Sequence, residues 1–382
     1  MAGIYLHIPF CVQRCSYCDF YSSTSLELKD KFIKACGNEI KSRKDYLADS
    51  VADTIYFGGG TPSVLHPEDI DKLLNIIVKH IGVSKDTEIS FEANPDDLNP
   101  AYLKELKSVG VNRLSIGIQS FRDSDLLKMK RRHNAKQAVK CLEDADKAGF
   151  NDLSIDLIYG LPDLSVDQWL FNLRQIEYFE VNHLSAYHLT IEKGTVFSRW
   201  LQEGKIKEAE DENSLKQFQL LQKYTREQGF DQYEISNFAK DEQYSKHNCK
   251  YWKAEKYIGL GPSAHSFNGE ARHWNQSDLM NYLSDFKSDN KKSSSVIREE
   301  ILSPFDKRNE LIMTSLRTKW GITKGEWEER QHLQSWDDFV LEVRPFIAKG
   351  DMIQNDQCLR IEEKSWFRAD GIIASLFRLE GL

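Results

Sequence analysis

The chain has 382 residues, a length that predicts one large domain and a smaller second one. Its 51 basic and 59 acidic residues give a formal net charge of −8, which argues against a protein whose main task is to bind nucleic acid. No apolar run approaches the roughly 18 residues that a membrane-spanning helix needs, and the N-terminus has neither the basic segment nor the cleavage site of a secretory signal. We therefore expect a cytoplasmic protein.

Short β-branched segments alternate with longer amphipathic segments over the first 190 residues. The expected strands are residues 3–8, 53–57, 87–92, 113–118, 153–157 and 183–187. Helical patterns lie between them at residues 28–46, 67–80, 100–109, 135–148 and 166–179, and a proline stands at the first position of the second and third helices. A repeated strand–helix–strand order is typical of parallel βαβ units.

Polar residues at strand ends distinguish a barrel from an open sheet. The first glycine-rich turn, residues 58–60, does not match the G-x-G-x-x-G pattern of a dinucleotide-binding sheet. Glu92, Gln119 and Asp156 instead lie towards the ends of three successive expected strands. A (β/α) barrel builds its site from side chains that converge from several strand ends. We predict an α/β fold, a partial TIM-type (β/α) barrel with a smaller, mainly helical C-terminal domain.

The alternation weakens beyond residue 190. Residues 205–228 predict a long charged helix and 230–235 a short strand, whereas 238–274 are rich in glycine, histidine and aromatics without a clear period. The Lys/Ser-rich stretch 287–295 suits an exposed linker, and apolar spacing predicts helices within 305–316 and 339–347. The expected division is a barrel core at 1–235, a segment of barrel-mouth loops at 236–290 and the helical domain at 291–382.

Three cysteines near the N-terminus, Cys11, Cys15 and Cys18, form a C-x3-C-x2-C pattern. Three thiolates on one loop suit a soft metal such as iron in a cluster, or zinc. A [4Fe–4S] cluster has four irons, each normally held by one cysteine, so three cysteines leave one iron without a protein ligand. Because an open coordination position separates a reactive metal site from a structural one, the pattern predicts an open cluster.

Two other uses of the cysteines need to be weighed. A structural zinc site is the alternative, with His7 as a fourth ligand. A disulfide is disfavoured because the seven cysteines are an odd number and the other four are scattered singly through the chain: Cys36, Cys141, Cys249 and Cys358. A thiol cluster also needs a reducing compartment, which agrees with the cytoplasm.

Five motifs follow one another over roughly the first half of the chain. They are the cysteine motif with Tyr17 before its last cysteine, YFGGGTP at 56–62, FEANP at 91–95, RLSIGIQSF at 113–121 and DLIYGLP at 156–162. Together they resemble the radical S-adenosylmethionine superfamily, in its branch of oxygen-independent coproporphyrinogen oxidases. The resemblance implies a [4Fe–4S] cluster whose open iron binds S-adenosylmethionine.

The same resemblance implies roles for residues of these motifs and of the stretch after them. Four polar residues are expected to bind the amino, ribose and carboxylate groups of S-adenosylmethionine: Glu92, Gln119, Arg131 and Asp156. A single carboxylate at a strand end is equally well explained as a helix cap. The prediction of a cofactor site therefore rests on the joint occurrence of all four polar residues.

Aromatic and glycine residues complete the expected cofactor site. Tyr5 and Tyr17 flank the cysteine motif, where they either shield the cluster and the adenine or pack in the core. Gly59, Gly60 and Thr61 follow the second expected strand. Glycines there either let the backbone approach a ligand or form a tight turn with no ligand.

A later motif separates two subfamilies of this branch. Residues 247–252, HNCKYW, resemble the HN-x-x-YW signature of the haem chaperones of the HemW family. The coproporphyrinogen oxidases have a further cysteine where this chain has Phe20, and a long extension before the tyrosine that corresponds to Tyr5. Both departures put coproporphyrinogen oxidation in doubt.

His247 is the candidate haem contact in this segment, because histidine is a common axial ligand of haem iron. Tyr251 and Trp252 would pack on the macrocycle. A hydrogen-bonded structural histidine is an equally good explanation, and Cys249 is either a second ligand or an ordinary buried thiol. We assign no role to His265.

Two functions remain open from the sequence. The first is a haem chaperone that holds the cluster, S-adenosylmethionine and haem, and delivers haem to a haem protein such as a respiratory oxidase. The second is an oxygen-independent coproporphyrinogen III oxidase, an enzyme of porphyrin biosynthesis. The resemblance also implies a homodimer and transient peripheral contact with a membrane.

Overall fold

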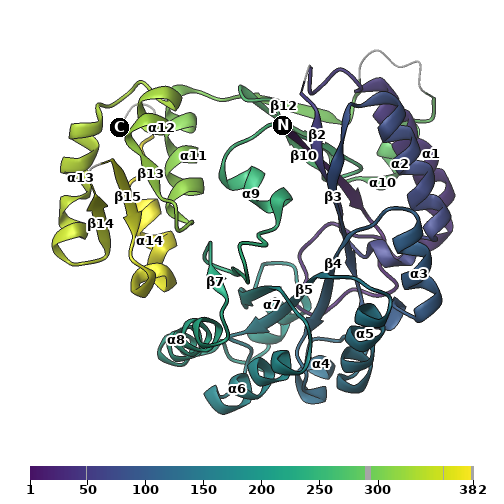
Figure 1. Ribbon diagram of the computed structural model, residues 1–382, viewed down its shortest axis with the longest axis horizontal. Coiled ribbons are helices and arrows are strands. Elements are labelled where there is room, and N and C mark those ends of the chain that lie inside the picture. Colours follow the sequence, from purple (N-terminus) through teal and green to yellow (C-terminus); the bar gives the residue numbers. More distant parts are fainter. Residues whose placement is uncertain (49, 289–293, 356, 380–382) are drawn as a thin grey trace.

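The computed structural model describes residues 1–48, 50–288, 294–355 and 357–379. Its main feature is one curved sheet of twelve strands in the order β12-β11-β10-β9-β1-β2-β3-β4-β5-β6-β8-β7 (Figure 1). The six strands predicted in the first half all form and pair in parallel in chain order: β1 (Ala2–Ile8), β2 (Ala52–Gly59), β3 (Val83–Ala93), β4 (Arg113–Gln119), β5 (Asp152–Tyr159) and β6 (His183–His188).

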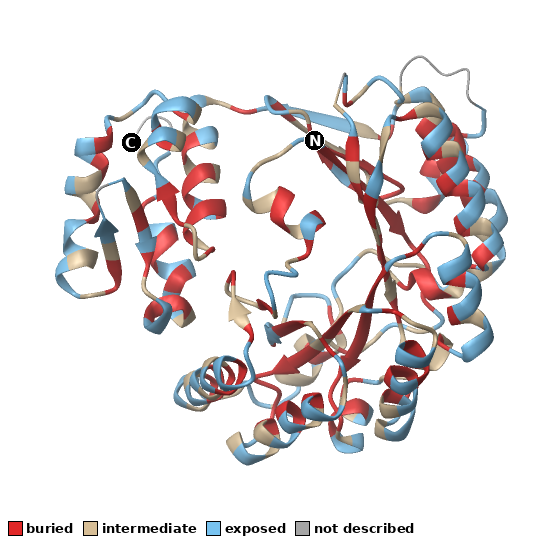
Figure 2. Cartoon of the chain, viewed as in Figure 1, coloured by how far each residue is buried: buried red, intermediate tan, exposed pale blue. Residues whose placement is uncertain are grey.

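The helices that connect these strands cover the outer, convex face of the sheet (Figure 1). The predicted ones are present with small differences at their ends: α1 (Lys29–Ser42), α2 (Pro67–His80), α3 (Pro100–Ser108), α5 (Ala135–Lys147) and α6 (Val166–Gln175). Two helices begin at the predicted prolines, and the Asn99 side chain caps α3 by accepting hydrogen bonds from two amides of its first turn. All seven residues of β4 are buried, because helices cover one face and the barrel interior fills the other (Figure 2).

The barrel is incomplete. β9 (Tyr257–Leu260) extends the parallel sheet on the far side of β1, and β10 (His265–Phe267), β11 (Ala271–Asn275) and β12 (Ile297–Ile301) follow as antiparallel strands. At the other edge, β8 (Asn237–Ala239) pairs antiparallel with β6, and β7 (Asp231–Gln232) with β8. In the described residues the edge strands β12 and β7 do not pair, so the prediction of a partial barrel is confirmed.

Several predictions for the second half of the chain need correction. Helix α8 (Asp211–Glu227) begins six residues later than predicted, and only two residues of the predicted strand 230–235 form β7. Helices of six or seven residues were not predicted, among them α4 (Asp123–Lys128), α7 (Val196–Gln202) and α9 (Lys246–Trp252), and no elements were predicted in 238–274. Elements of three to seven residues are too short to show a period, and they form because they pair with the sheet or pack on it. The predicted linker 287–295 lies partly outside the described residues.

The C-terminal region contains the helices predicted within 305–316 and 339–347, together with a small sheet. The helices are α11 (Pro304–Leu316), α12 (Lys324–Arg330), α13 (Trp336–Ala348) and α14 (Ala369–Ser375). Three antiparallel strands, β13 (Ile322–Thr323), β15 (Cys358–Ile361) and β14 (Met352–Asn355), complete it. The three-part division of the chain given above remains a prediction.

The remaining elements are short. Helix α10 (Leu279–Asp285) lies against α1, and five 3-10 helices occupy turns: η1 (Leu26–Leu28), η2 (Pro62–Val64), η3 (Pro95–Asp97), η4 (Ile176–Tyr178) and η5 (Glu363–Arg368). Helix α9 packs against β1 and β2 on one side and α11 on the other, so it joins the barrel to the C-terminal region (Figure 1). Among the described helices, none combines the length and apolar composition that crossing a membrane requires.

Candidate functional site

The three predicted cluster ligands lie on one loop after β1. Residues 9–25, called the cysteine loop below, carry Cys11, Cys15 and Cys18, and all seven cysteines of the chain are free thiols. Backbone hydrogen bonds anchor this loop to three other segments: Thr61 N–H to Phe10 C=O (2.7 Å), Ser16 N–H to Met129 C=O (3.0 Å) and Phe197 N–H to Ser16 C=O (2.9 Å). A loop without regular structure is thus held in place from several sides of the barrel mouth.

Arg131 lies against the cysteine loop and tests whether the loop fits an anionic cluster. Its Nη1 donates to Cys15 Sγ (3.4 Å), and its Nη2 donates to Asn94 Oδ1 (2.6 Å) and Gly117 C=O (2.7 Å). Its Nε is buried and has no hydrogen-bond partner among the described residues. A fixed positive charge with an unused donor beside the thiols fits a group that carries negative charge, as a thiolate-bound cluster does.

The spacing of the ligands bears on the zinc alternative. A structural zinc ion needs four ligands around a single centre. Within the part of the chain that the structure describes, no group of three or more His, Cys, Asp or Glu side chains is arranged to hold one metal ion. A [4Fe–4S] cluster uses one cysteine per iron and therefore needs no common centre. Burial raises the pKa of Cys11, and that of Cys18 to about 11, so metal binding would release protons from this loop.

Glu92 of β3 and Asp156 of β5 place two carboxyl groups inside the barrel. Glu92 accepts hydrogen bonds from Tyr56 Oη (2.8 Å) and Gly59 N–H (3.3 Å), and Asp156 accepts one from Ser115 Oγ (3.2 Å). Burial raises the pKa of Glu92 to about 7 and that of Asp156 to about 6. Neither carboxylate belongs to an ion pair among the described residues, so both can receive the positive charge of a ligand.

Gln119 ends β4, the strand between β3 and β5, in a strained conformation. Its φ is +67°, a left-handed value that residues other than glycine, asparagine and aspartate seldom adopt. Gly117 makes room for it, since a Cβ there would lie 2.9 Å from Gln119 Nε2 and 3.4 Å from Arg131 Nη2. The Gln119 amide and the Arg131 guanidinium both lie close to Gly117, and strained backbone of this kind gathers at functional sites.

The glycine turn after β2 packs against the cysteine loop. Gly59 has φ +103°, and a Cβ on it would lie 2.6 Å from the His7 ring. A Cβ on Gly60 would lie 2.7 Å from the carbonyl oxygen of Phe10. Their amide groups already donate within the protein, and Thr61 Oγ1 donates to Cys11 Sγ (3.3 Å). The glycines therefore permit the close approach of two protein segments, and their contact with a ligand remains a prediction.

The two predicted tyrosines occupy different surroundings. The Tyr5 ring forms a cluster with those of Tyr56 (centroids 6.1 Å apart) and His247 (6.3 Å), which also stack on each other (5.1 Å). Tyr17 is partly buried against the core beside Arg131, and burial raises its pKa above the ordinary value. Core packing explains both side chains, and the proximity of Tyr17 to the cysteines also keeps its expected cofactor role open.

His247 lies on α9 near the N-terminal ends of β1 and β2, whereas the cysteine loop and Glu92 lie towards the C-terminal ends of the strands. Its side chain is 1% exposed, its Nδ1 pairs with Thr54 Oγ1 (2.8 Å) and its Nε2 with Tyr251 Oη (2.8 Å). Burial, with the charge of Lys250, lowers its pKa to about 3. Haem ligation by His247 would require one of these two hydrogen bonds to open.

The other side of α9 faces the C-terminal region. Cys249 is buried in a cluster with Tyr233 and next to Trp320, and the guanidinium of Arg317 lies 5.8 Å from the Trp252 ring centre. Side chains of residues 247–252 therefore contact the barrel on one side and the C-terminal region on the other. This arrangement accounts for the composition of the motif by packing alone.

The structure also gives roles to three residues that were not predicted to support the cofactor site, of which His7 was predicted only as a possible zinc ligand. Asn94 holds Arg131, Tyr56 holds Glu92, and His7 fills the space above Gly59. Asn94 and Tyr56 lie inside two of the motifs shared with the superfamily, and this position in the sequence could have pointed to their role at the site. The role of His7 depends on the position of a glycine about 50 residues away, which no local pattern encodes.

Comparison with known proteins agrees with this geometry. The sequence profile of the radical SAM superfamily matches residues 5–175, and that of the HemN C-terminal domain matches residues 302–368. The solved structure of coproporphyrinogen III oxidase (HemN) from Escherichia coli superposes with a TM-score of 0.83 at 22% identity, covering 98% of this chain and 89% of that one. The fold and the site define a radical SAM protein with a HemN-type C-terminal domain, the class for which a [4Fe–4S] cluster and S-adenosylmethionine are the cofactors.

Curated relatives narrow the assignment within this class. The heme chaperone HemW of Bacillus subtilis (strain 168) is 33% identical over 363 residues, which cover 94% of each chain. The mitochondrial radical S-adenosyl methionine domain-containing protein 1 of Mus musculus is 30% identical over 387 residues, covering 98% of this chain and 87% of that protein. The chain belongs to the HemW family of radical SAM proteins.

Proposed function

We propose that this chain is a haem chaperone of the HemW type. The observation that carries the proposal is the 33% identity to a protein named as a heme chaperone, over 94% of both chains. Phe20 supports it, because the oxidase branch is expected to have a further cysteine at this position. The resemblance to the E. coli oxidase, at 22% identity, supports the fold and not the oxidase activity.

The cofactor site of the proposal uses residues whose positions are described above. Cys11, Cys15 and Cys18 would each hold one iron of a [4Fe–4S] cluster, which supplies one-electron reduction of bound S-adenosylmethionine. Arg131 would balance the negative charge near Cys15, to which it donates.

Residues inside the barrel would hold S-adenosylmethionine. Two half-buried carboxylates would pair with its positive charge and its ribose hydroxyls, the strained Gln119 amide would contribute hydrogen bonds, and the barrel interior would exclude water. The residues proposed to hold S-adenosylmethionine are Glu92, Gln119 and Asp156, with Tyr5, Tyr17, Gly59, Gly60 and Thr61 around them.

The finer parts of the proposal concern cargo and surroundings. Haem is the cargo, and a haem protein such as a respiratory oxidase is the acceptor. A reducing compartment such as the cytoplasm would preserve the cysteines for the cluster. A homodimer and transient contact with a membrane surface belong to the same proposal.

The test compares haem transfer with porphyrin chemistry on one preparation. Anaerobically reconstituted protein is titrated with haem, followed by the Soret band, and then mixed with an apo haem protein. We expect saturable binding and transfer. The same sample is assayed with a reductant, S-adenosylmethionine and coproporphyrinogen III, and no protoporphyrinogen above the protein-free background is expected. Catalytic turnover without haem transfer would overturn the proposal in favour of the oxidase.

A further inference from the structure

We propose that haem binds in a cavity between the cysteine loop and the β9–β10 hairpin, with His265 as the axial ligand of the iron. This inference rests on the proposed function, since it names the site of the proposed cargo. The cavity has a volume of about 340 Å³. Its lining residues come from the cysteine loop, β1, α9, β9 and the turn and strand that follow β9.

Aromatic side chains from four segments form the cavity wall. Phe20 and Tyr21 come from the cysteine loop, Tyr251 from α9, Tyr257 from β9 and Tyr5 from β1. Aromatic rings give a porphyrin large, flat contact surfaces. The volume lies at the small end of the range of ligand pockets, about 300–1,000 Å³, so part of a porphyrin would remain exposed. Partial exposure suits a carrier that must release its cargo.

Phe20 supplies a separate reason to expect a ligand here. Its side chain is 64% exposed although it lines the cavity. It follows the last cluster cysteine by two positions, so a macrocycle packed on it would lie beside the cluster loop. A large exposed aromatic ring at the mouth of an aromatic cavity is the kind of surface that a flat apolar ligand covers.

The histidines near this cavity differ in whether their nitrogens are available. His7 lines the cavity, but its Nε2 pairs with Tyr21 C=O (2.9 Å) and its Nδ1 with Tyr5 Oη (3.2 Å). His247, behind Tyr251, is engaged at both nitrogens. His265 is exposed and, within the described residues, neither of its ring nitrogens makes a hydrogen bond; its ring stacks on Trp274 with centroids 6.0 Å apart.

The backbone that carries His265 is firmly positioned. The amide of Gly261 donates to the buried Glu39 carboxylate (2.8 Å), and a Cβ on Gly261 would lie 2.4 Å from the carbonyl oxygen of His7. Although His265 is largely exposed, partial desolvation of its ring and the nearby charge of Arg272 lower its pKa. The imidazole is therefore neutral near neutral pH, which is the form that binds a metal.

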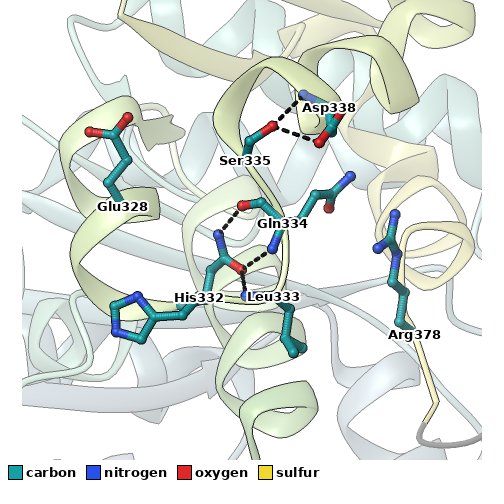
Figure 3. Close-up of a pocket in the computed structure, with 8 residues that line it drawn as sticks. Glu328, His332, Leu333, Gln334, Ser335, Asp338 and Arg378 are labelled. Carbon is teal, nitrogen blue, oxygen red and sulfur yellow. Dashed lines mark hydrogen bonds between the residues drawn. The ribbon is translucent and has the colours of Figure 1, made fainter.

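Other cavities are less suitable for haem. A cavity of about 520 Å³ in the C-terminal region is lined mainly by charged and amide side chains, among them Glu328, Asp338 and Arg378, with His332 beside them (Figure 3). Two further cavities, beside Phe171 and beside Ile33, have no histidine in their walls. The cavity beside the cysteine loop combines aromatic walls with an available imidazole.

The experiment uses protein with its cluster reconstituted, so that the cluster cysteines are not free to bind haem iron. Haem is titrated into the wild type, His265→Ala and His66→Ala; His66 is an exposed histidine at the start of α2 and serves as the matched control. We expect His265→Ala to weaken binding about tenfold or more and to shift the Soret band, because an axial ligand is lost. His66→Ala should behave as the wild type does.

A second variant detects ligation directly. His265→Cys is expected to replace the imidazole spectrum with that of a thiolate-bound haem, a change that no purely structural role of His265 would produce. Phe20→Ser is expected to weaken binding without changing the ligand spectrum. If both His265 variants bind haem with the affinity and the spectrum of the wild type, this inference is overturned and the proposed function remains intact. Absence of haem binding by the wild type would instead refute the proposed function.

Discussion

Glu92 and Asp156 illustrate at the scale of single residues how the barrel interior changes ordinary carboxyl groups. Burial raises the pKa of both carboxyl groups, and the negative charge of Asp156 raises the pKa of Glu92 further. Without a cationic partner, both groups therefore favour their protonated forms at slightly acidic pH. A cationic ligand would reverse this preference, because it stabilises the ionised forms.

The first prediction follows from the raised pKa of Glu92. This pKa is about 7 in the folded chain against an ordinary value of 4.5, so the folded state binds more protons between these values and stability falls as pH rises through this window. Glu92→Gln in the cofactor-free protein removes the cost of ionising this carboxyl group at pH 8, but it weakens the hydrogen bond from Gly59. The net effect should raise the free energy of unfolding by about 1–2 kcal/mol.

Chemical denaturation at two pH values measures this effect. At pH 4 the carboxyl group is protonated in the folded state, and we expect no gain from Glu92→Gln. Glu68→Gln, on the exposed surface of α2, serves as the control and should change stability little at either pH. A loss of stability in Glu92→Gln at pH 8 would contradict the prediction.

At the scale of elements, α9 depends on contacts with distant strands. It has seven residues, too few for a stable isolated helix. The buried Glu88 of β3 accepts hydrogen bonds from the amides of Lys246 (2.9 Å) and His247 (3.2 Å) at the start of the helix. A negative charge at a helix N-terminus also interacts favourably with the helix dipole.

The second prediction concerns this cap. Glu88→Ala leaves two amides and the Ser90 hydroxyl without their acceptor, so we expect a loss of about 1–3 kcal/mol in the free energy of unfolding. The control, Glu299→Ala, removes an exposed partner of His273 and should cost at most about 0.5 kcal/mol. Equal effects of the two variants in urea denaturation would show that the cap of α9 contributes little.

At the scale of the whole molecule, a small aromatic cluster connects the barrel with the C-terminal region. Tyr233 is fully buried, its ring lies 4.7 Å from that of Tyr244 and 6.2 Å from that of Trp320, and its hydroxyl pairs with His183 Nε2 (2.8 Å) on β6. The carbonyl group of Tyr233 also accepts from Lys319 N–H (3.0 Å). One side chain therefore contacts both parts of the chain.

The third prediction separates the packing of Tyr233 from its hydrogen bond. Tyr233→Phe removes only the hydroxyl and should cost about 1–2 kcal/mol, whereas Tyr233→Ala should cost about 3–5 kcal/mol because it leaves a cavity in the cluster. Amide hydrogen exchange should become faster in α11 for the alanine variant alone.

Unchanged amide exchange in α11 of Tyr233→Ala would mean that other contacts hold the C-terminal region in place. Tyr178→Ala, which truncates an exposed ring, is the control for general effects of removing a tyrosine.

Local sequence patterns determined much of the parallel half of the barrel. Six strands and five helices follow from hydrophobic periodicity and from proline at two helix starts, because this information lies within short contiguous segments. The cysteine motif and the polar residues near strand ends also predicted residues that the fold brings to one end of the sheet, since parallel strands bring their C-terminal ends to one side.

The tertiary structure decided what these patterns do not encode. Arg131 reaches Cys15 across 116 positions and His247 reaches Thr54 across 193, so their partners became visible only when the chain was folded. The strands β7 to β11 have two to five residues and gain their stability from pairing with a sheet that the earlier part of the chain forms. For the same reason the availability of His265, in contrast to the engaged His7 and His247, is a property of packing and not of sequence.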